Sequence, residues 1–336
     1  MKTSTAIIYV DPASRSPLSM ETDEMQGQEV WRGHLRNKEG MDFPIKDGIP
    51  DLTYPRQLHR RDEHARSFYE GRVEGYEKNL YLTFHIQGEN EETIRNSMID
   101  SLGLNPEYRV LEIACGTGRD SQLIAKRLGP NGRLFLQDIS PGMVNFCRSK
   151  LGTVSVPTEY SVGNACYLPF QDRYFDAVYS FGALGEFSDI RRSLSEMVRV
   201  TKVGGRIGVG DESMPPWLRE TTFAKILATT NPQFMAEIPL KDVPIDARSV
   251  RLRWIIGGVF YFLDFTVGEG EPTAEFDLEI PGPRGGTLRT RYEGQLEGVT
   301  PEAKKLVQQA IAKKGTSMHK WLDAVVRDAA KRDLGT

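Results

Sequence analysis

The chain has 336 residues, a formal net charge of −3, 39% hydrophobic residues and 26% charged residues. This length exceeds what a single hydrophobic core usually holds, so we expect one main domain with substantial additions. The slightly acidic balance argues against a general nucleic-acid-binding surface. The longest apolar run is too short to cross a bilayer and no signal peptide is visible, so we expect a soluble, cytoplasmic protein.

Residues 1–55 are predicted to form a separate small unit. Thr5 to Val10 favours a short strand, and Asp42 to Leu52 favours a second strand with a turn. The latter stretch, D-F-P-I-K-D-G-I-P-D-L, resembles the end of a zinc-ribbon module that occurs alone as a methyltransferase activator or fused to some rRNA methylases. Asp11 and Ser14 stand where a C-x-x-C pair would fall, and a structural zinc site needs four ligands. We therefore expect a degenerate ribbon without metal, which needs packing partners and permits a homodimer.

Residues 56–104 are predicted to be helical and to form a lid. The segment 56–79 is charged with interspersed aromatic residues, and 91–102 carries apolar residues at helical spacing. Tyr69 and Tyr76 either fold over a ligand or simply pack between helix and core. The sequence leaves both alternatives open.

The most informative stretch, Val110 to Asp120, reads V-L-E-I-A-C-G-T-G-R-D. It predicts a buried strand, a glycine turn and the start of a helix whose N-terminus favours negative charge. Gly116 and Gly118 allow backbone angles that a Cβ would forbid, and they let a ligand approach the main chain. A second apolar run ends in Asp138, at the position where an acid can bind a ribose diol.

Two classes of cofactor use this arrangement, and two residues separate them. A dinucleotide-binding turn reads G-x-G-x-x-G, but here the third position is Ser121. Glu112, inside the first strand, suits a cationic amino-acid tail better than a pyrophosphate.

The whole pattern resembles the class I S-adenosylmethionine-dependent methyltransferases, whose first motif is similar to V-L-E-I-A-C-G-T-G. Three further stretches match in order and spacing: Asp138 to Met143, then Gly163 to Phe170 with Phe175 to Val178, and then Glu196 to Arg206. The most similar group is the ubiquinone/menaquinone-biosynthesis type. Together the motifs cover about a third of the chain.

This resemblance implies an α/β fold over residues 105–300, with a doubly wound Rossmann-like sheet whose final strand is antiparallel. It also implies S-adenosyl-L-methionine as the cofactor. The three cysteines, Cys115, Cys147 and Cys166, have no metal-binding spacing, so we expect no metal. Ala114 stands where glycine is usual, and Asn164 stands where an aspartate commonly meets the adenine amine. The residues implied to contact the cofactor are Glu112, Ala114, Cys115, Gly116, Thr117, Gly118, Asp138, Ile139, Met143, Asn164, Ala165 and Ser180.

A substrate insertion is expected around residues 212–248, with a helix from Pro215 to about Thr230. Two apolar segments flank Gly257-Gly258 and predict a hairpin of the last two strands of the sheet. Thr287 to Tyr292 favours one further strand, and residues 301–336 are predicted to be helical.

Catalytic residues are harder to predict, because the methyl donor is already activated and the enzyme mainly aligns the acceptor. His85 and Glu186 are the candidates for catalysis, although Glu186 could equally cap the next helix. A proton acceptor is useful only for some acceptors, such as hydroxyls. The candidate substrate residues are Tyr69, Tyr76, Trp217, Arg289 and Arg291.

The leading hypothesis is methyl transfer to a small apolar or aromatic metabolite, with a carbon, oxygen or nitrogen acceptor undecided. One alternative is an rRNA or tRNA methylase, which the ribbon-like N-terminus favours and the acidic charge opposes. Another is a cofactor-binding protein that does not methylate, such as a cyclase or a scaffold.

Overall fold

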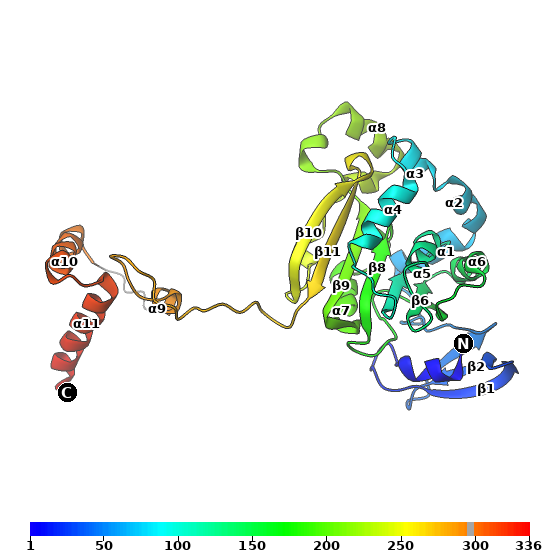
Figure 1. The fold of residues 1–336 in the computed structure, drawn as a ribbon, viewed down its shortest axis with the longest axis horizontal. Coiled ribbons are helices and arrows are strands. Elements are labelled where there is room, and N and C mark those ends of the chain that lie inside the picture. The colour runs from blue at the N-terminus through cyan, green and yellow to red at the C-terminus, as the bar shows by residue number, and fades with distance from the viewer. Residues whose placement is uncertain (294–298) are drawn as a thin grey trace. The chain divides into compact units, whose positions relative to one another are not determined.

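The computed structural model describes residues 1–293 and 299–336 (Figure 1). Contacts divide the chain into two compact units, Met1–Glu271 and Pro272–Thr336. Residues 294–298, which fall inside the expected core range of 105–300, lie outside the described residues. The expected domain limits at residues 55, 104 and 300 stay predictions.

A seven-stranded sheet forms the centre of the first unit, in the order β10-β11-β9-β8-β5-β6-β7 (Figure 1). The pairs among β5 to β9 are parallel, whereas β11 runs antiparallel to β9 and β10 antiparallel to β11. This confirms the Rossmann-like sheet with an antiparallel final strand. The strands are β5 (Arg109–Ile113), β6 (Arg133–Asp138), β7 (Thr158–Val162), β8 (Phe175–Phe181), β9 (Thr201–Glu212), β10 (Ala247–Ile255) and β11 (Phe260–Val267).

Strand β5 is the first strand of the sheet in chain order, and it lies between β6 and β8. The chain adds β6 and β7 on one side of β5 and then crosses to β8 on the other. Ligands bind at such a reversal of strand order, outside the carboxyl ends of the strands. Val110, Leu111 and Ile113 are all buried, as expected for a parallel strand covered on both faces.

Helices follow these strands after short turns because each has a start signal. Gly118, with φ of 82°, precedes α5 (Arg119–Ala125). The Ser140 hydroxyl accepts a hydrogen bond from the Met143 N–H at 3.2 Å, and Pro141 occupies the first position of α6 (Pro141–Leu151). The Asp189 carboxylate caps α7 (Ile190–Val200) in the same way. These turns place the residues after β5 and β6 at one edge of the sheet.

Four helices precede the sheet and confirm the helical prediction for this stretch. They are α1 (Arg60–Glu70), α2 (Val73–Asn79), α3 (Leu82–His85) and α4 (Glu91–Asp100). Helices α1 and α2 both contact α6. A further helix, α8 (Thr222–Thr230), lies between β9 and β10, preceded by a 3₁₀ turn at Pro216–Leu218. None of the helices among the described residues combines the length and apolar character that membrane crossing requires.

The N-terminal residues form an antiparallel sheet in the order β1-β2-β3-β4. Its strands are β1 (Ser19–Gln26), β2 (Glu29–Arg36), β3 (Asp42–Lys46) and β4 (Ile49–Pro50). The expected strand and turn within Asp42 to Leu52 are therefore confirmed. Directly after β4, the Leu52 N–H donates to the Val162 carbonyl at 2.8 Å, so the module joins the end of β7.

The expected strand at Thr5 to Val10 is wrong, because Thr3–Ile8 forms a 3₁₀ helix. A strand would direct Ile7 and Tyr9 to the same side. In the structure Ile7 is 75% exposed whereas Tyr9 is buried, with its ring 5.5 Å from that of Phe170. The helical turn is what brings Ile8 and Tyr9 together into the core.

The second unit contains α9 (Leu288–Glu293), α10 (Pro301–Lys314) and α11 (Met318–Leu334). The helices expected after residue 301 are confirmed, but the strand expected at Thr287 to Tyr292 is wrong. The Thr287 hydroxyl accepts a hydrogen bond from the Thr290 N–H at 3.1 Å, which is a helix-capping contact. This local signal outweighs the β-branched residues of the segment.

Candidate functional site

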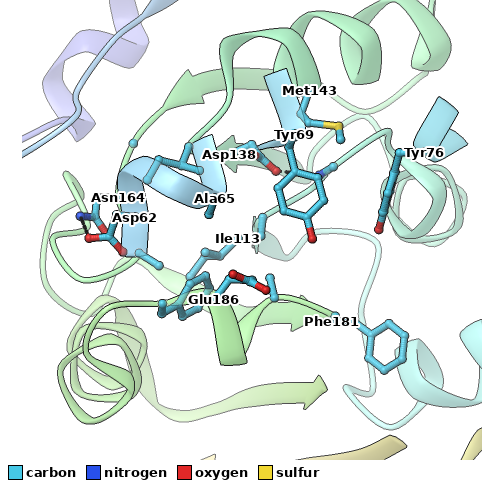
Figure 2. A pocket seen from close by; sticks show the side chains of 18 residues that line it. Asp62, Ala65, Tyr69, Tyr76, Ile113, Asp138, Met143, Asn164, Phe181 and Glu186 are labelled. Atoms are coloured by element: carbon cyan, nitrogen blue, oxygen red, sulfur yellow. Dashed lines mark hydrogen bonds between the residues drawn. The ribbon is translucent and has the colours of Figure 1, made fainter. Parts of the chain in front are cut away.

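A cavity lies at the carboxyl ends of β5, β6 and β8, next to helices α1 and α2 (Figure 2). The space inside this first cavity and its mouth, part of which is open to solvent, is about 680 Å³. Its walls are Asp62, Ala65, Tyr69, Tyr76, Ile113, Ala114, Gly116, Asp138, Ile139, Met143, Gly163, Asn164, Ala165, Phe181, Gly182, Ala183, Glu186 and Phe187.

A second cavity of about 720 Å³ shares six of these residues: Tyr69, Tyr76, Ala114, Gly116, Phe181 and Gly182. It continues past the glycine turn to Glu112, Arg95 and Asp120, and on its other side to Glu212 and Phe260. The two cavities therefore meet beside the turn that follows β5, where both are lined by Ala114 and Gly116.

The glycine turn has the strained backbone that its sequence predicts. Ala114 and Gly116 adopt φ of 56° and 50°, in the left-handed region that glycine tolerates best. A Cβ added to Gly116 would meet no atom within 4 Å, so the space beside this residue is open. The Gly116 N–H donates to the Asp138 Oδ2 at 2.9 Å, which links the ends of β5 and β6.

Asp138 is a buried carboxylate in the wall of the first cavity. Its Oδ1 also accepts a hydrogen bond from the Ser140 N–H at 2.9 Å. Burial raises the pKa of Asp138 to about 6, although the hydrogen bonds from Ser140 and Gly116 oppose this effect. At neutral pH the group is an ionised acceptor at the position expected for a ribose-binding acid.

Glu112 lies at the far end of the second cavity, where its Oε2 accepts a hydrogen bond from the Ser121 hydroxyl at 2.6 Å. Burial, reinforced by the nearby Asp120, raises the pKa of Glu112 well above its ordinary value. Arg95 reaches the same place from α4 and donates to Asp120 at 2.6 Å. This end of the cavity therefore offers both carboxylates and a guanidinium, the groups that bind an amino-acid zwitterion.

Arg95 and Asp120 were not predicted as site residues. Arg95 lies on the buried side of α4 with Met98 and Ile99, and it is 6% exposed. A basic residue among apolar positions of a helix is a signal that sequence inspection could have used, because lone charges are rarely buried.

Asn164 lines the first cavity with both ends of its amide engaged. Its Nδ2 donates to the Asp62 Oδ2 at 3.1 Å, and its Oδ1 accepts from the Cys166 N–H at 3.0 Å. Asp62 belongs to α1, and nothing in the sequence pattern singled it out. Figure 2 shows the two side chains facing each other at one end of the cavity.

Aromatic side chains and carboxylates share the region where the cavities meet. The rings of Tyr69 and Tyr76 lie edge to face with centroids 5.6 Å apart. Burial raises the pKa of Tyr76 to about 12, and burial together with Tyr76 and Glu186 raises that of Tyr69 further, so both hydroxyls stay protonated. The Glu186 Oε1 accepts a hydrogen bond from the Gln233 amide at 3.1 Å. Figure 2 shows Tyr69 and Glu186 at the cavity wall.

Several predicted residues lie elsewhere. His85 is exposed on α3, and Trp217 is 70% exposed with its ring 6.2 Å from that of Trp254. Neither is among the lining residues of the two cavities. Ser180 is buried and also lies outside both linings. The structure thus brings neither predicted histidine nor tryptophan to the site, and their roles stay untested.

Gly118 has a packing role in the structure. A Cβ at this position would lie 2.7 Å from the Cys147 Sγ, so glycine allows α5 to approach α6. By contrast, Cys115 and Thr117 line the second cavity. Of the two glycines expected to lie beside the cofactor, Gly116 has open space next to its Cα, whereas Gly118 is packed against Cys147.

Arg289 and Arg291 belong to the second unit. They lie on α9, and not on the strand expected at Thr287 to Tyr292. Arg289 pairs with Asp277 at 2.9 Å, and Arg291 donates to the Gly285 carbonyl at 2.8 Å. The guanidinium groups of both side chains are thus engaged by contacts within the second unit.

Glu77 connects α2 to the turn and to two basic residues. Its carboxylate accepts hydrogen bonds from the Thr117 hydroxyl, from Arg119 at 3.2 Å and from Lys150 at 2.6 Å. Burial alone would raise the pKa of Glu77, but the hydrogen bonds from Lys150 and Thr117 outweigh it and hold the pKa below its ordinary value. Ionised Glu77 therefore stabilises the docked α2 at neutral pH, and this contribution is lost as the pH falls below about 4.5.

Replacing Glu77 by glutamine is expected to loosen α2 at neutral pH. Because the pairs are partly exposed, we expect a loss of about 1 kcal/mol, or about fivefold faster cleavage by trypsin near Lys78 under native conditions. Glu74→Gln on the same helix, where the side chain is exposed, is the matched control. Equal cleavage rates for the two variants at pH 7 would contradict the role of Glu77.

Comparison with known proteins agrees with this geometry. Residues 110–205 match a protein family described as a methyltransferase domain. This part of the chain is therefore similar to a methyltransferase domain.

Among curated proteins, the chain is similar to ubiquinone/menaquinone biosynthesis C-methyltransferases. It is 36% identical to that of Cupriavidus taiwanensis over 111 residues, which is 33% of this chain and 46% of the relative. It is 38% identical to that of Bordetella avium over 109 residues, or 32% of this chain and 43% of the relative. The chain thus spans a little under half the length of these relatives.

Solved structures show a weaker likeness. A methyltransferase of Bacillus halodurans is 15% identical, with a TM-score of 0.41 over 52% of this chain and 99% of that chain. A complex of the Haloferax volcanii Trm112 methyltransferase activator with a methyltransferase is 16% identical, with a TM-score of 0.44 over 64% of this chain and 100% of that chain.

The residues of the two cavities fit S-adenosylmethionine. The open space beside Gly116 lies between a buried acceptor, Asp138, and an end that carries Glu112 and Arg95. Asp138 would hold the ribose hydroxyls, while Glu112 and Arg95 would hold the ammonium and carboxylate of the amino-acid end. Ile139 and Met143 line the first cavity, where they would contact the base.

Proposed function

We propose that the chain binds S-adenosylmethionine across the two cavities and transfers its methyl group to a small apolar or aromatic molecule. The observation that carries this proposal is the open space at Gly116, between Asp138 on one side and Glu112 with Arg95 on the other. The curated relatives support methyl transfer to a small molecule, although the chain matches less than half of their length.

The acceptor would lie where the cavities meet, beside Tyr69, Tyr76 and Phe181. Aromatic walls favour a planar or apolar acceptor, since such rings pack edge to face or offset against one another. Bound S-adenosylmethionine supplies an activated methyl group with a neutral leaving group. The side chains then need only orient the acceptor and exclude water.

Glu186 is the candidate proton acceptor of this region. It lines the first cavity, and the neutral amide of Gln233 leaves its second carboxylate oxygen free to accept another hydrogen bond. Such a group would take the proton of a hydroxyl acceptor, whereas a carbon or nitrogen acceptor would make different use of it. His85, exposed on α3, is less well placed for this role.

Isothermal titration of the full chain with S-adenosylhomocysteine tests the proposal directly. We expect binding with a Kd in the micromolar range, because a buried carboxylate acceptor and a zwitterion-binding end are both present. ATP, which shares the adenosine but lacks the amino-acid end, is the matched control and should bind at least about tenfold more weakly. Failure to bind S-adenosylhomocysteine at high micromolar concentration would overturn the proposed function.

A further inference from the structure

Asp62 brings an acidic side chain from α1 to the wall of the first cavity. It is 3% exposed and lies in the first turn of α1, about one hundred residues before Asn164 in the chain. Its Oδ1 accepts a hydrogen bond from the Ser188 N–H at 3.0 Å. Its Oδ2 accepts from the Ser188 hydroxyl at 2.7 Å and from the Asn164 amide at 3.1 Å.

These three donors fix the orientation of the carboxylate. All three are uncharged groups, and a carboxylate offers about four lone-pair positions. One acceptor position therefore remains on Asp62. A buried carboxylate is costly unless its acceptors are used, so a ligand that donates a hydrogen bond here is favoured.

Asn164 is less suited to receive such a donor. Its amide orientation is determined by its partners, because Asp62 can only accept and the Cys166 N–H can only donate. The amide oxygen is thus turned toward its own backbone, and the amide nitrogen toward Asp62. Asn164 orients Asp62, and Asp62 carries the acceptor that faces the cavity.

The base of S-adenosylmethionine supplies a matching donor, since the exocyclic amino group of adenine carries two N–H bonds. Gly163, Asn164 and Ala165 line the cavity beside Asp62, directly after the end of β7. The ribose-binding Asp138 lies at the end of the neighbouring strand β6. A nucleoside held by its ribose at Asp138 would direct its base along this wall.

We propose that Asp62 accepts a hydrogen bond from the exocyclic amino group of the cofactor's adenine, and that Asn164 is a positioning residue for Asp62. The proposal rests on the proposed function, because it assumes that the cofactor binds in the first cavity. It assigns to α1 a direct part in recognising the base. Docking of α1 and selection of adenine then depend on the same carboxylate.

A carboxylate distinguishes an amino group from a carbonyl more strictly than an amide does. An amide can rotate to offer either an acceptor or a donor, whereas an ionised carboxylate offers only acceptors. A 6-oxo purine would place its oxygen against Asp62 and leave both groups without a donor. Such a mismatch commonly lowers affinity by tenfold or more.

The test is isothermal titration of the full chain with S-adenosylhomocysteine and with its inosine counterpart, S-inosylhomocysteine. We expect the wild type to bind the inosine compound at least about tenfold more weakly. In Asp62→Asn the ratio of the two affinities should fall to within about threefold. In Asn164→Ala the ratio should fall only in part and stay above about threefold, because the carboxylate remains but loses one of the donors that orient it.

Glu63→Gln, an exposed neighbour on α1, is the matched control and should keep the wild-type ratio. The proposal is overturned if the wild type binds both compounds equally, or if Asp62→Asn keeps the wild-type ratio. It is also overturned if the ratio collapses in Asn164→Ala, which remains decisive should Asp62→Asn fail to fold. In these outcomes S-adenosylhomocysteine still binds the wild type, whereas failure of the proposed function abolishes that binding itself.

Discussion

Asp138→Asn is expected to lower the affinity for S-adenosylhomocysteine by about 10- to 100-fold, the largest loss we expect from a single polar substitution at the site. The carboxylate is buried, and its two oxygens accept from the Gly116 and Ser140 N–H groups. An asparagine would use its one oxygen on these backbone donors and present an N–H donor where a ribose hydroxyl of the proposed complex needs an acceptor. A buried hydrogen bond lost in this way costs about 1–3 kcal/mol.

The same residue gives the binding a pH dependence. The pKa of Asp138 is raised to about 6 by burial, and in the proposed complex the ribose hydroxyls would donate to the ionised form. Affinity of the wild type should therefore fall as the pH is lowered from 7 to 5, approaching tenfold per pH unit below the pKa. The Asn variant should lack this component, so comparing titrations at pH 5, 6 and 7 isolates it. A parallel profile in the variant would contradict the assignment.

Folding of the free chain depends on Asp138 with the opposite sign. Its pKa in the folded state lies above the unfolded value of 3.8, so the group favours folding most below pH 3.8 and loses this contribution as the pH rises through about 6. The shift corresponds to about 3 kcal/mol. At neutral pH the ionised carboxylate of Asp138 therefore destabilises the folded free chain. A ligand that donates hydrogen bonds to this carboxylate would offset the cost.

The first strands and their turns could be predicted because their signals are local. The run Val110 to Ile113, the glycines after it and Asp138 at the end of the next strand determine the position of the first cavity. Parallel strands place their carboxyl ends at one edge, so residues far apart in the chain meet there by topology alone. Gly116 and Asp138 accordingly form the hydrogen bond that joins the two strands.

Asp62 could not be found in this way, because its position depends on how the helices before the sheet pack. Asp62 lies in a helix that is charged on all sides, and only its contact with Ser188 and Asn164 distinguishes it from exposed neighbours. The strand predicted at Thr287 failed for a related reason. The side-chain cap at Thr287 favours a helix there, and no strand of the described residues pairs with the segment; composition carries neither signal.

Gly118→Ala is expected to destabilise the first unit strongly, although Gly116→Ala two residues earlier is expected to affect mainly ligand binding. At Gly118 the backbone has φ of 82°, and an added Cβ would lie 2.7 Å from the Cys147 Sγ and 3.0 Å from the Leu151 Cδ1. The left-handed backbone costs about 1–2 kcal/mol for alanine, and overpacking adds about 1–3 kcal/mol. For a unit of this size the sum lowers Tm by about 5–12 °C.

At Gly116 the backbone is also left-handed, but the added Cβ meets no atom within 4 Å. Its variant should lose only a few degrees in Tm, while the methyl group enters the space proposed for the cofactor and lowers S-adenosylhomocysteine affinity by at least about tenfold. Thermal unfolding and titration of both variants separate the two roles. Adding Cys147→Ala to Gly118→Ala should recover part of the lost Tm, because it removes the closest contact. Equal Tm losses for the two glycine variants, with no recovery in the double variant, would show that backbone strain alone governs this turn.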